Sequence, residues 1–259
     1  MASAATFYDQ LAADYDGLTH TSKRSAVACD FVRELHVRAP FSSALDAACG
    51  TGIFTRPLAE FAPRVCGADL SAEMLRQAEY ESRDIAADIQ WTEAPMQDLP
   101  EVLDDPFDLI LCMGNSLPHL LTRAELQKTI RGFAQLLTTH GTLVLHQLNY
   151  DRLLARGERL VGATRSENTS YVRFYDLQGE QIIFNVIATQ WFDDGKSQSQ
   201  WHSTALRPHR TAELIDALQN AGFDPVEPYG DLAFSPYDPA ESNLLVLQAT
   251  RRETPSCGA

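Results

Sequence analysis

A glycine-rich turn near residue 50 constrains the fold of this chain more than any other segment. It reads Asp46-Ala-Ala-Cys-Gly50-Thr-Gly52, follows an apolar run and precedes a stretch, 53–61, with a helical pattern. Gly50 and Gly52 permit positive φ values and close approach of a ligand to the backbone, and the N-terminus of the following helix favours an anionic group. The dinucleotide-binding spacing G-x-G-x-x-G and the Lys-Ser/Thr of a phosphate-binding loop are both absent from this turn. Because a tight structural turn is the alternative interpretation, a ligand assignment needs a second feature.

The second feature is the carboxylate of Asp69, which lies 17 positions beyond Gly52 at the end of the next predicted strand. A carboxylate at this place can accept hydrogen bonds from both hydroxyls of a ribose. Taken alone, Asp69 and Ser71 would equally suit the N-cap of a helix over 72–82. Together with the glycine-rich turn, Asp69 favours a nucleoside ligand.

The pattern of the first 150 residues predicts a parallel sheet covered by helices, because short β-rich runs alternate with amphipathic stretches between residues 43 and 148. We expect a helix at 123–137 and strands at 44–48, 64–68, 89–92, 107–113 and 141–148.

After Tyr150 the pattern changes to an alternation of apolar and polar residues, which indicates antiparallel strands. We expect these strands at 171–175, 181–192 and 199–206, followed by a helix from Thr211 to near Gly222 and two strands at 225–229 and 243–250. The main sheet is expected to finish antiparallel.

The chain length of 259 residues suits one large domain with an insertion. We expect N-terminal cap helices and a nucleoside-binding α/β core over 1–150, an antiparallel β insertion over 151–208, and the completion of the core sheet over 209–259. The insertion would lie at the carboxyl edge of the parallel strands and serve as a lid or substrate wall.

Composition narrows the classes of partner. The net charge of −14 opposes the basic surface that binding to nucleic acid requires. The five cysteines show no spacing of a disulfide framework or a metal site, and no leader or membrane-spanning run is apparent, so we expect no metal, no membrane and a cytoplasmic location. The sequence is compatible with a homo-oligomer.

Five segments together resemble class I S-adenosylmethionine-dependent methyltransferases, particularly the glycine and sarcosine N-methyltransferase group. They are the turn Asp46-Ala-Ala-Cys-Gly-Thr-Gly52, Asp69-Leu-Ser-Ala-Glu-Met74-Leu, Phe107-Asp-Leu-Ile-Leu-Cys-Met-Gly114-Asn-Ser-Leu-Pro-His119-Leu, His146-Gln-Leu-Asn-Tyr150-Asp, and Phe7-Tyr-Asp-Gln-Leu-Ala-Ala-Asp-Tyr15-Asp. The resemblance covers nearly the whole chain. It implies an α/β, Rossmann-like class I methyltransferase fold, with a mostly parallel seven-stranded sheet, an antiparallel last strand and a small antiparallel β insertion. It also implies S-adenosyl-L-methionine as the cofactor.

The resemblance assigns site residues by position. It implies that the turn containing Ala48, Gly50 and Gly52 lies against the methionine part of the cofactor and that Asp69 holds the ribose. It further implies adenine contacts from Leu70 and Met74, coverage of the methyl-donor side by Tyr8 and Tyr15, a carboxylate contact from Arg24, and cofactor-lining roles for Met96, Met113 and His119.

Some of these assignments have alternatives. The family's acidic residue just before Met96 is replaced by Pro95, so Gln97 or Asp98 is expected to take its place. Tyr8 could instead be a core aromatic and His119 a residue at a helix start.

Methyl transfer from a sulfonium is an in-line displacement, so the protein must align the reacting atoms and exclude water. The candidate catalytic residues are Asn115, His146 and Tyr150, with His146 as a base that takes the proton of an amine; a structural role at a strand end is the alternative for His146.

The methyl acceptor is expected to be a small molecule that is methylated at nitrogen. Glycine-type relatives carry an arginine next to Asn-Tyr-Asp, and Leu148 stands there in this chain, which indicates an acceptor that is less anionic or more apolar than glycine. Candidate wall residues are Tyr150, Phe174, Trp191 and Trp201. An O-methyltransferase, a nucleotide-cofactor oxidoreductase and a non-catalytic cofactor-binding protein on the same fold are the alternatives.

Overall fold

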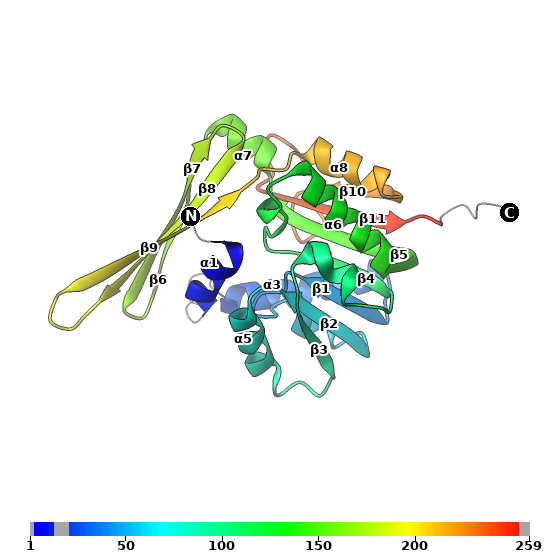
Figure 1. Ribbon diagram of the computed structural model, residues 1–259, viewed down its shortest axis with the longest axis horizontal. Coiled ribbons are helices and arrows are strands. Elements are labelled where there is room, and N and C mark those ends of the chain that lie inside the picture. Colours follow the sequence, from blue (N-terminus) through cyan, green and yellow to red (C-terminus); the bar gives the residue numbers. More distant parts are fainter. Residues whose placement is uncertain (1–2, 13–20, 254–259) are drawn as a thin grey trace.

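The core of the protein is a mixed sheet of seven strands with helices on both faces (Figure 1), as seen in a computed structural model that describes residues 3–12 and 21–253. The strand order is β10-β11-β5-β4-β1-β2-β3. The pairs among β1 to β5 are parallel, whereas β11 runs antiparallel to both β5 and β10. The predicted fold class is therefore confirmed, including the antiparallel last strand. The strands are β1 (Ser43–Ala47), β2 (Arg64–Asp69), β3 (Ile89–Glu93), β4 (Phe107–Cys112), β5 (Leu137–Leu148), β10 (Phe223–Tyr229) and β11 (Leu244–Arg251).

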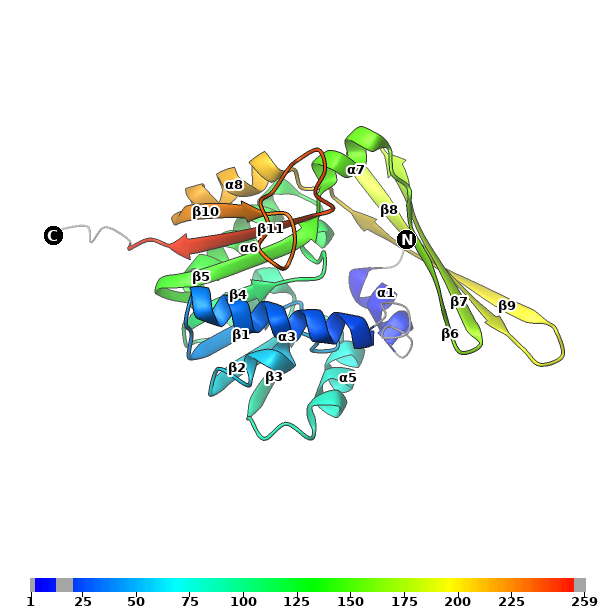
Figure 2. The same cartoon turned by 180° about the vertical axis from the view of Figure 1, so that it is seen from behind.

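Helices bury the two faces of this sheet in separate apolar clusters, and Figures 1 and 2 view the sheet from opposite sides. One cluster lies under α3 and α4, the other under α6, α8 and η2. All five residues of β1 are buried, as expected for a parallel strand covered on both faces. The helices are α3 (Thr21–Arg38), α4 (Thr55–Leu58), α5 (Ala72–Ser82), η2 (Met96–Glu101), α6 (Arg123–Leu136) and α8 (Thr211–Asn220), and a short turn of helix, η3 (Leu117–His119), follows β4.

The sequence of α6 shows why these helices form where they do. Thr122 and Glu125 make a reciprocal capping box at its start, which satisfies backbone N–H groups that have no partner inside the helix. Leu126, Ile130 and Phe133 recur at helical spacing and are fully buried against the sheet. The predicted helix at 123–137 is thus confirmed to within one residue.

A second, four-stranded antiparallel sheet extends away from the core (Figures 1 and 2), and we call it the insertion sheet. Its strands pair in sequence order. Helix α7 (Tyr150–Arg156) joins it to β5, beginning at the N-cap Asn149 and ending at Gly157, whose φ of 63° suits a glycine. The strands are β6 (Leu160–Ser166), β7 (Thr169–Gln178), β8 (Gln181–Trp191) and β9 (Ser197–Leu206).

Helix α1 (Ala4–Leu11) lies between the insertion sheet and the core (Figure 1). Its Phe7 and Leu11 are buried against Tyr171 and Val186 of the insertion sheet. The Oε1 atom of Gln10 accepts a hydrogen bond of 2.9 Å from the Nδ1 atom of His202 in β9. The N-terminal helix therefore packs against the insertion sheet and stabilises its position near the carboxyl edge of the parallel strands.

Some local expectations were wrong in extent, among them the strand expected at 171–175, which is longer in β7, and one strand was not expected. The helix predicted at 53–61 shortens to α4, because residues 51–54 form turns that complete the glycine-rich loop. Strand β5 begins earlier than expected, at Leu137, directly after α6. Strand β6 was not predicted, because its mostly exposed residues lack a clear apolar alternation.

Within the part of the chain that the structure describes, no helix is both long enough and apolar enough to cross a membrane.

Candidate active site

The turn after β1 adopts the conformation that its small residues permit. Ala48, Gly50 and Gly52 have positive φ angles of 58°, 56° and 76°. No atom lies within 4 Å of the place where a Cβ of Gly50 would be, so the backbone there is open to a ligand. A Cβ on Gly52 would instead come within 3.1 Å of Trp91. Gly52 therefore allows close packing of the turn, whereas Gly50 allows close approach from the cavity.

Asp69 is the last residue of β2, the strand next to β1, and its side chain stabilises the turn. Its Oδ2 atom accepts the backbone N–H of Gly50 at 2.8 Å, and its Oδ1 atom accepts that of Ser71 at 2.9 Å. Burial raises the pKa of Asp69, against the lowering effect of these two N–H groups. Asp69 thus stabilises the turn through Gly50 and the start of α5 through Ser71. It also lines the wall of the cavity.

Asp46 is a second buried carboxyl beneath the turn. Its Oδ2 atom accepts a hydrogen bond of 2.6 Å from the hydroxyl of Thr55. Burial raises the pKa of Asp46 to about 7, and the nearby charge of Asp69 adds to the rise. The floor of the cavity therefore contains two carboxyl groups that a cationic ligand would help to ionise.

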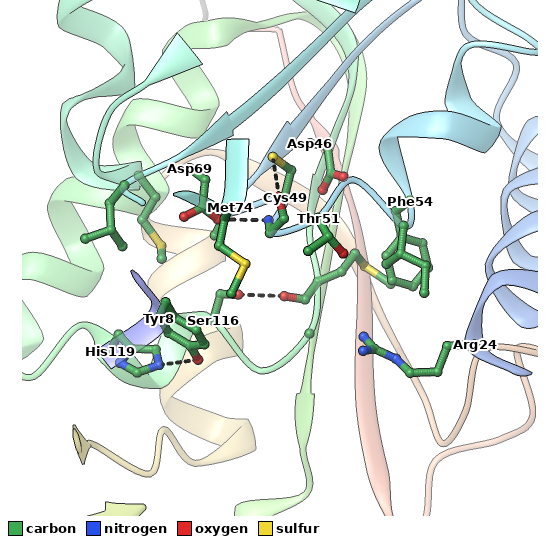
Figure 3. Close-up of a pocket in the computed structure, with 17 residues that line it drawn as sticks. Tyr8, Arg24, Asp46, Cys49, Thr51, Phe54, Asp69, Met74, Ser116 and His119 are labelled. Carbon is green, nitrogen blue, oxygen red and sulfur yellow. Dashed lines mark hydrogen bonds between the residues drawn. The ribbon is translucent and has the colours of Figure 1, made fainter. Parts of the chain in front are cut away.

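These groups line a first cavity of about 700 Å³, including its open mouth, at the carboxyl edge of the parallel strands (Figure 3). Most residues that the sequence assigned to the cofactor meet there, namely Tyr8, Arg24, Ala48, Gly50, Asp69, Leu70, Met74, Met96, Met113 and His119. The first cavity is also lined by residues that the sequence did not single out for it, namely Asp46, Cys49, Thr51, Ile53, Phe54, Gly114 and Ser116. Several of these flank the predicted positions directly in the sequence, and that proximity was the available signal.

Two predicted cofactor residues in the described part of the chain, Gly52 and Gln97, do not line the first cavity. Gly52 packs against Trp91, and Gln97 lies on η2 away from the lining. The alternative to Gln97, Asp98, forms a surface salt bridge of 2.6 Å with Lys128. Tyr15 lies outside the described residues.

Arg24 enters the first cavity from α3, and Figure 3 shows Arg24 and Asp69 at opposite ends of it. Its guanidinium makes no hydrogen bond or salt bridge with any residue in 3–12 or 21–253. A cation at one end and a carboxylate at the other match the two ends of a molecule that carries both a carboxylate and a ribose.

A second cavity of about 910 Å³, including its open mouth, adjoins the first. Tyr8, Arg24, Gly114 and His119 line both cavities. The two cavities therefore meet at these four residues, which we call the junction. The other residues that line the second cavity are Phe7, Leu11, Asn115, His146, Leu148, Val161, Arg173, Tyr175, Phe184 and Leu206.

Two residues of the junction are joined by a hydrogen bond. The hydroxyl of Tyr8 lies 2.9 Å from the Nε2 atom of His119, and Figure 3 shows this contact. Burial lowers the pKa of His119 to about 4, so its ring is neutral at neutral pH. Tyr8 and His119 thus present an uncharged surface where the cavities meet.

His146, on β5, also lines the second cavity, and its hydrogen bonding restricts its chemistry. Its Nδ1 atom lies 3.1 Å from the backbone N–H of Gly114, so Nδ1 is the acceptor and Nε2 carries the hydrogen. Burial, together with the charge of Arg24, lowers the pKa of His146 to about 4. A neutral imidazole has one lone pair, and Gly114 already occupies it. This geometry argues against the predicted role of His146 as a base.

Asn115 and Tyr150 form a linked pair at the edge of the second cavity. The hydroxyl of Tyr150 lies 3.0 and 3.1 Å from the amide nitrogen and oxygen of Asn115, and the amide oxygen also accepts the N–H of Leu148 at 3.1 Å. Asn115 has a φ of 68°, a costly conformation that clusters at functional sites. Asn115 lines the second cavity, whereas the buried Tyr150 does not and instead holds Asn115 in place.

The expected wall residues of the insertion lie on the wrong face of its sheet. Phe174 packs against Trp201 with ring centroids 6.0 Å apart, and Trp201 and Trp191 are 64% and 45% exposed. Tyr175 on β7 faces the cavity instead, and it pairs with Phe184 across the strands. Because neighbouring side chains on a strand point to opposite faces, a shift of one residue exchanges the two sets.

The residues that the structure describes contain no group of three or more histidine, cysteine, aspartate or glutamate side chains that could hold a metal ion.

Comparisons with known proteins agree with this architecture. Residues 44–141 match the family described as a methyltransferase domain. The chain is 28% identical to the glycine/sarcosine N-methyltransferase of Halorhodospira halochloris over 253 residues, which cover 95% of this chain and 88% of that protein. It is 30% identical to the dTDP-3-amino-3,6-dideoxy-alpha-D-glucopyranose N,N-dimethyltransferase of Streptomyces fradiae over 132 residues, which cover 51% of this chain and 49% of that protein.

A solved structure shares the whole fold. An S-adenosylmethionine-dependent methyltransferase from Clostridium acetobutylicum superposes with a TM-score of 0.79 at 18% identity, covering 95% of this chain and 99% of that chain. The matched family spans the segment that contains the glycine-rich turn, Asp69 and Met113. Residues 44–141 therefore form a methyltransferase domain, and the relatives and the shared fold together support a class I S-adenosylmethionine-dependent methyltransferase.

Proposed function

We propose that this enzyme transfers the methyl group of S-adenosylmethionine to the nitrogen of a small amine held in the second cavity. The junction carries this proposal, because Tyr8, Arg24, Gly114 and His119 line both cavities. In-line displacement requires donor and acceptor to approach from opposite sides of the methyl group, and two adjoining cavities provide that arrangement. Both relatives named above are N-methyltransferases, which favours nitrogen over oxygen as the acceptor atom.

The first cavity has groups that match both the ribose and the carboxylate of the cofactor. We assign the ribose hydroxyls to Asp69 and the carboxylate to Arg24, whose guanidinium has no other partner among the described residues. The adenine would lie against Leu70, Met74 and Met96. When bound, S-adenosylmethionine supplies a methyl group activated by its sulfonium charge, and the open backbone at Gly50 leaves room for the methionine part.

The second cavity suits an amine that arrives neutral. None of the described residues that line it is an aspartate or glutamate, and both His119 and His146 are neutral at neutral pH. A protonated ammonium would therefore find no counter-charge there, and desolvation favours the form with a free lone pair. Asn115 would contact the acceptor, with Tyr150 and His146 as positioning residues, and the amine would lose its proton to water.

Glycine itself fits this cavity poorly. The cavity holds far more space than glycine would fill, and Leu148, Val161, Phe184 and Leu206 give it an apolar surface. We therefore infer an acceptor with an apolar or ring-shaped body. The net charge of −14 favours a small molecule over a nucleic acid as the acceptor. We further propose a cytoplasmic location.

Methyl transfer from S-adenosylmethionine labelled with ¹³C in its methyl group tests this proposal. The protein is incubated with pairs of compounds that share a skeleton and carry either an amino or a hydroxyl group, and with glycine. We expect an N-¹³CH₃ signal from amines with a ring or apolar body, and little from glycine. Labelled O-methyl products would contradict methylation at nitrogen, and efficient glycine turnover would contradict the larger acceptor.

A further inference from the structure

Arg173 brings a guanidinium into the second cavity from the insertion sheet. It lies on β7, on the same face as Tyr171 and Tyr175, and it lines the second cavity but not the first. On β6 it pairs with Gly162, where a Cβ would come within 3.3 Å of the Nη2 atom of Arg173. The absence of a side chain at Gly162 thus leaves room for the guanidinium.

The charged side chains described in the lining of the second cavity are all positive. Among its lining residues in the described ranges, Arg24 and Arg173 are charged at neutral pH, and both are cations. The protein as a whole carries a net charge of −14, so these two cations stand out among the described lining residues of an acidic molecule. Two guanidinium groups favour a ligand that carries an anionic group over one whose only charge is an ammonium.

The two arginines have different neighbours. Arg24 belongs to the junction and, in the proposed function, pairs with the carboxylate of the cofactor. Arg173 lies outside the junction, on the wall formed by the insertion sheet. With the cofactor bound, Arg173 is therefore the cation among the described lining residues that faces the acceptor.

We propose that Arg173 determines acceptor specificity by binding an anionic oxygen group, a carboxylate or a phosphate, on the amine that is methylated. This inference rests on the proposed function of the second cavity. The planar guanidinium can donate two parallel hydrogen bonds to either group, and a buried anion requires such a partner. The amine would then lie at the junction, the apolar body against Leu148, Phe184 and Leu206, and the anionic group at Arg173.

This assignment changes the interpretation of Leu148. The missing arginine at position 148 indicated an acceptor less anionic than glycine, but the structure places another guanidinium in the cavity that Leu148 lines. The recognised anion would bind farther along the cavity wall, which fits an acceptor longer than glycine.

Binding of three aromatic probes to the complex with S-adenosylhomocysteine tests Arg173 without any methyl transfer. The probes are benzoate, phenyl phosphate and the uncharged benzamide, and isothermal titration calorimetry measures their Kd values. The variant is Arg173→Gln, which keeps the size of the side chain but removes its charge. The matched control is Arg165→Gln, because Arg165 is an exposed arginine on β6 of the same sheet and does not line the cavity.

We expect at least one anionic probe to bind about tenfold or more tightly than benzamide to the wild type and to Arg165→Gln. The preference should disappear in Arg173→Gln and survive in part in Arg173→Lys, with the affinity for S-adenosylhomocysteine unchanged. Benzoate and phenyl phosphate distinguish a carboxylate site from a phosphate site. No preference for either anion in the wild type, including no binding at all, or a preference that survives in Arg173→Gln, would overturn the proposal. The proposed function fails separately, if S-adenosylmethionine binds and no amine is methylated.

Discussion

At the scale of single residues, Arg24 is a cation that lines both cavities. It projects from α3 into the junction and makes no ion pair with the residues that the structure describes. The carboxylate of the methionine part of the cofactor is the partner that we propose. A guanidinium whose partner is removed loses a charge-assisted hydrogen bond, which contributes roughly 1.5–3 kcal/mol.

Arg24→Gln should therefore weaken binding of S-adenosylmethionine about tenfold to a hundredfold. It should leave binding of decarboxylated S-adenosylmethionine nearly unchanged, because that ligand lacks the group that Arg24 contacts. Titration calorimetry of both ligands checks this prediction. Arg33→Gln is the control, because Arg33 lies on the same helix and forms an exposed salt bridge with Asp30. Equal losses for the two ligands would place the carboxylate elsewhere.

Asp46 contributes to the pH dependence of stability. Its pKa in the folded protein is about 7, above the ordinary value of 3.8, because it is buried. The folded protein therefore binds more protons than the unfolded chain between these two values, and the free energy of unfolding falls as pH rises through that window. Above pH 7 the full penalty of an ionised, buried Asp46 is present.

Asp46→Asn removes this penalty, so its stability relative to the wild type should improve between pH 5 and pH 8, by at most roughly 3 kcal/mol. Urea unfolding of both proteins without cofactor measures the free energies of unfolding at the two pH values. A difference between the proteins that is the same at both pH values would show that Asp46 does not titrate in this range.

At the scale of elements, the insertion sheet has two faces with different tasks. Phe184 faces the second cavity, whereas Phe174 lies on the opposite face beside Trp201. The conservative changes Phe184→Leu and Phe174→Leu therefore form a matched pair.

We expect Phe184→Leu to raise the KM for the methyl acceptor severalfold, because it reshapes the cavity wall, with the affinity for the cofactor unchanged. Phe174→Leu should leave both quantities near their wild-type values. Steady-state kinetics with any acceptor found for the wild type measures the effect. A larger change in the KM from Phe174→Leu than from Phe184→Leu would reverse the assignment of the faces.

The core elements could be predicted from the sequence because their signals are local. The glycine-rich turn, Asp69 and the apolar runs of the parallel strands each occupy a few consecutive residues, and the structure brings them together at one sheet edge. The facing of the insertion sheet could not be predicted, because Phe174 and Tyr175 differ only in the side of the sheet to which they point. Arg173 carried no motif, and its place in the second cavity depends on how the insertion sheet folds against α1.

At the scale of the whole molecule, the cavities depend on three parts of the chain. The core supplies the turn and Asp69, α1 supplies Tyr8, and the insertion sheet supplies Arg173. A ligand that binds the first cavity stabilises the folded state by mass action, because the unfolded chain has no such cavity.

S-adenosylhomocysteine at a hundred times its Kd should therefore stabilise the protein by about 2.7 kcal/mol and raise its Tm by roughly 5–10 °C. A nicotinamide dinucleotide at the same concentration should leave the Tm unchanged, because the turn lacks the dinucleotide spacing. Differential scanning fluorimetry makes the comparison. A shift with the dinucleotide alone would favour an oxidoreductase.

The position of the cofactor's sulfur atom in a crystal structure of the complex with S-adenosylhomocysteine tests the central claim most directly. We predict that the ribose lies at Asp69, the carboxylate lies at Arg24, and the sulfur lies at the junction and faces the second cavity. A sulfur atom directed away from the second cavity, or a cofactor bound outside the first cavity, would contradict the account.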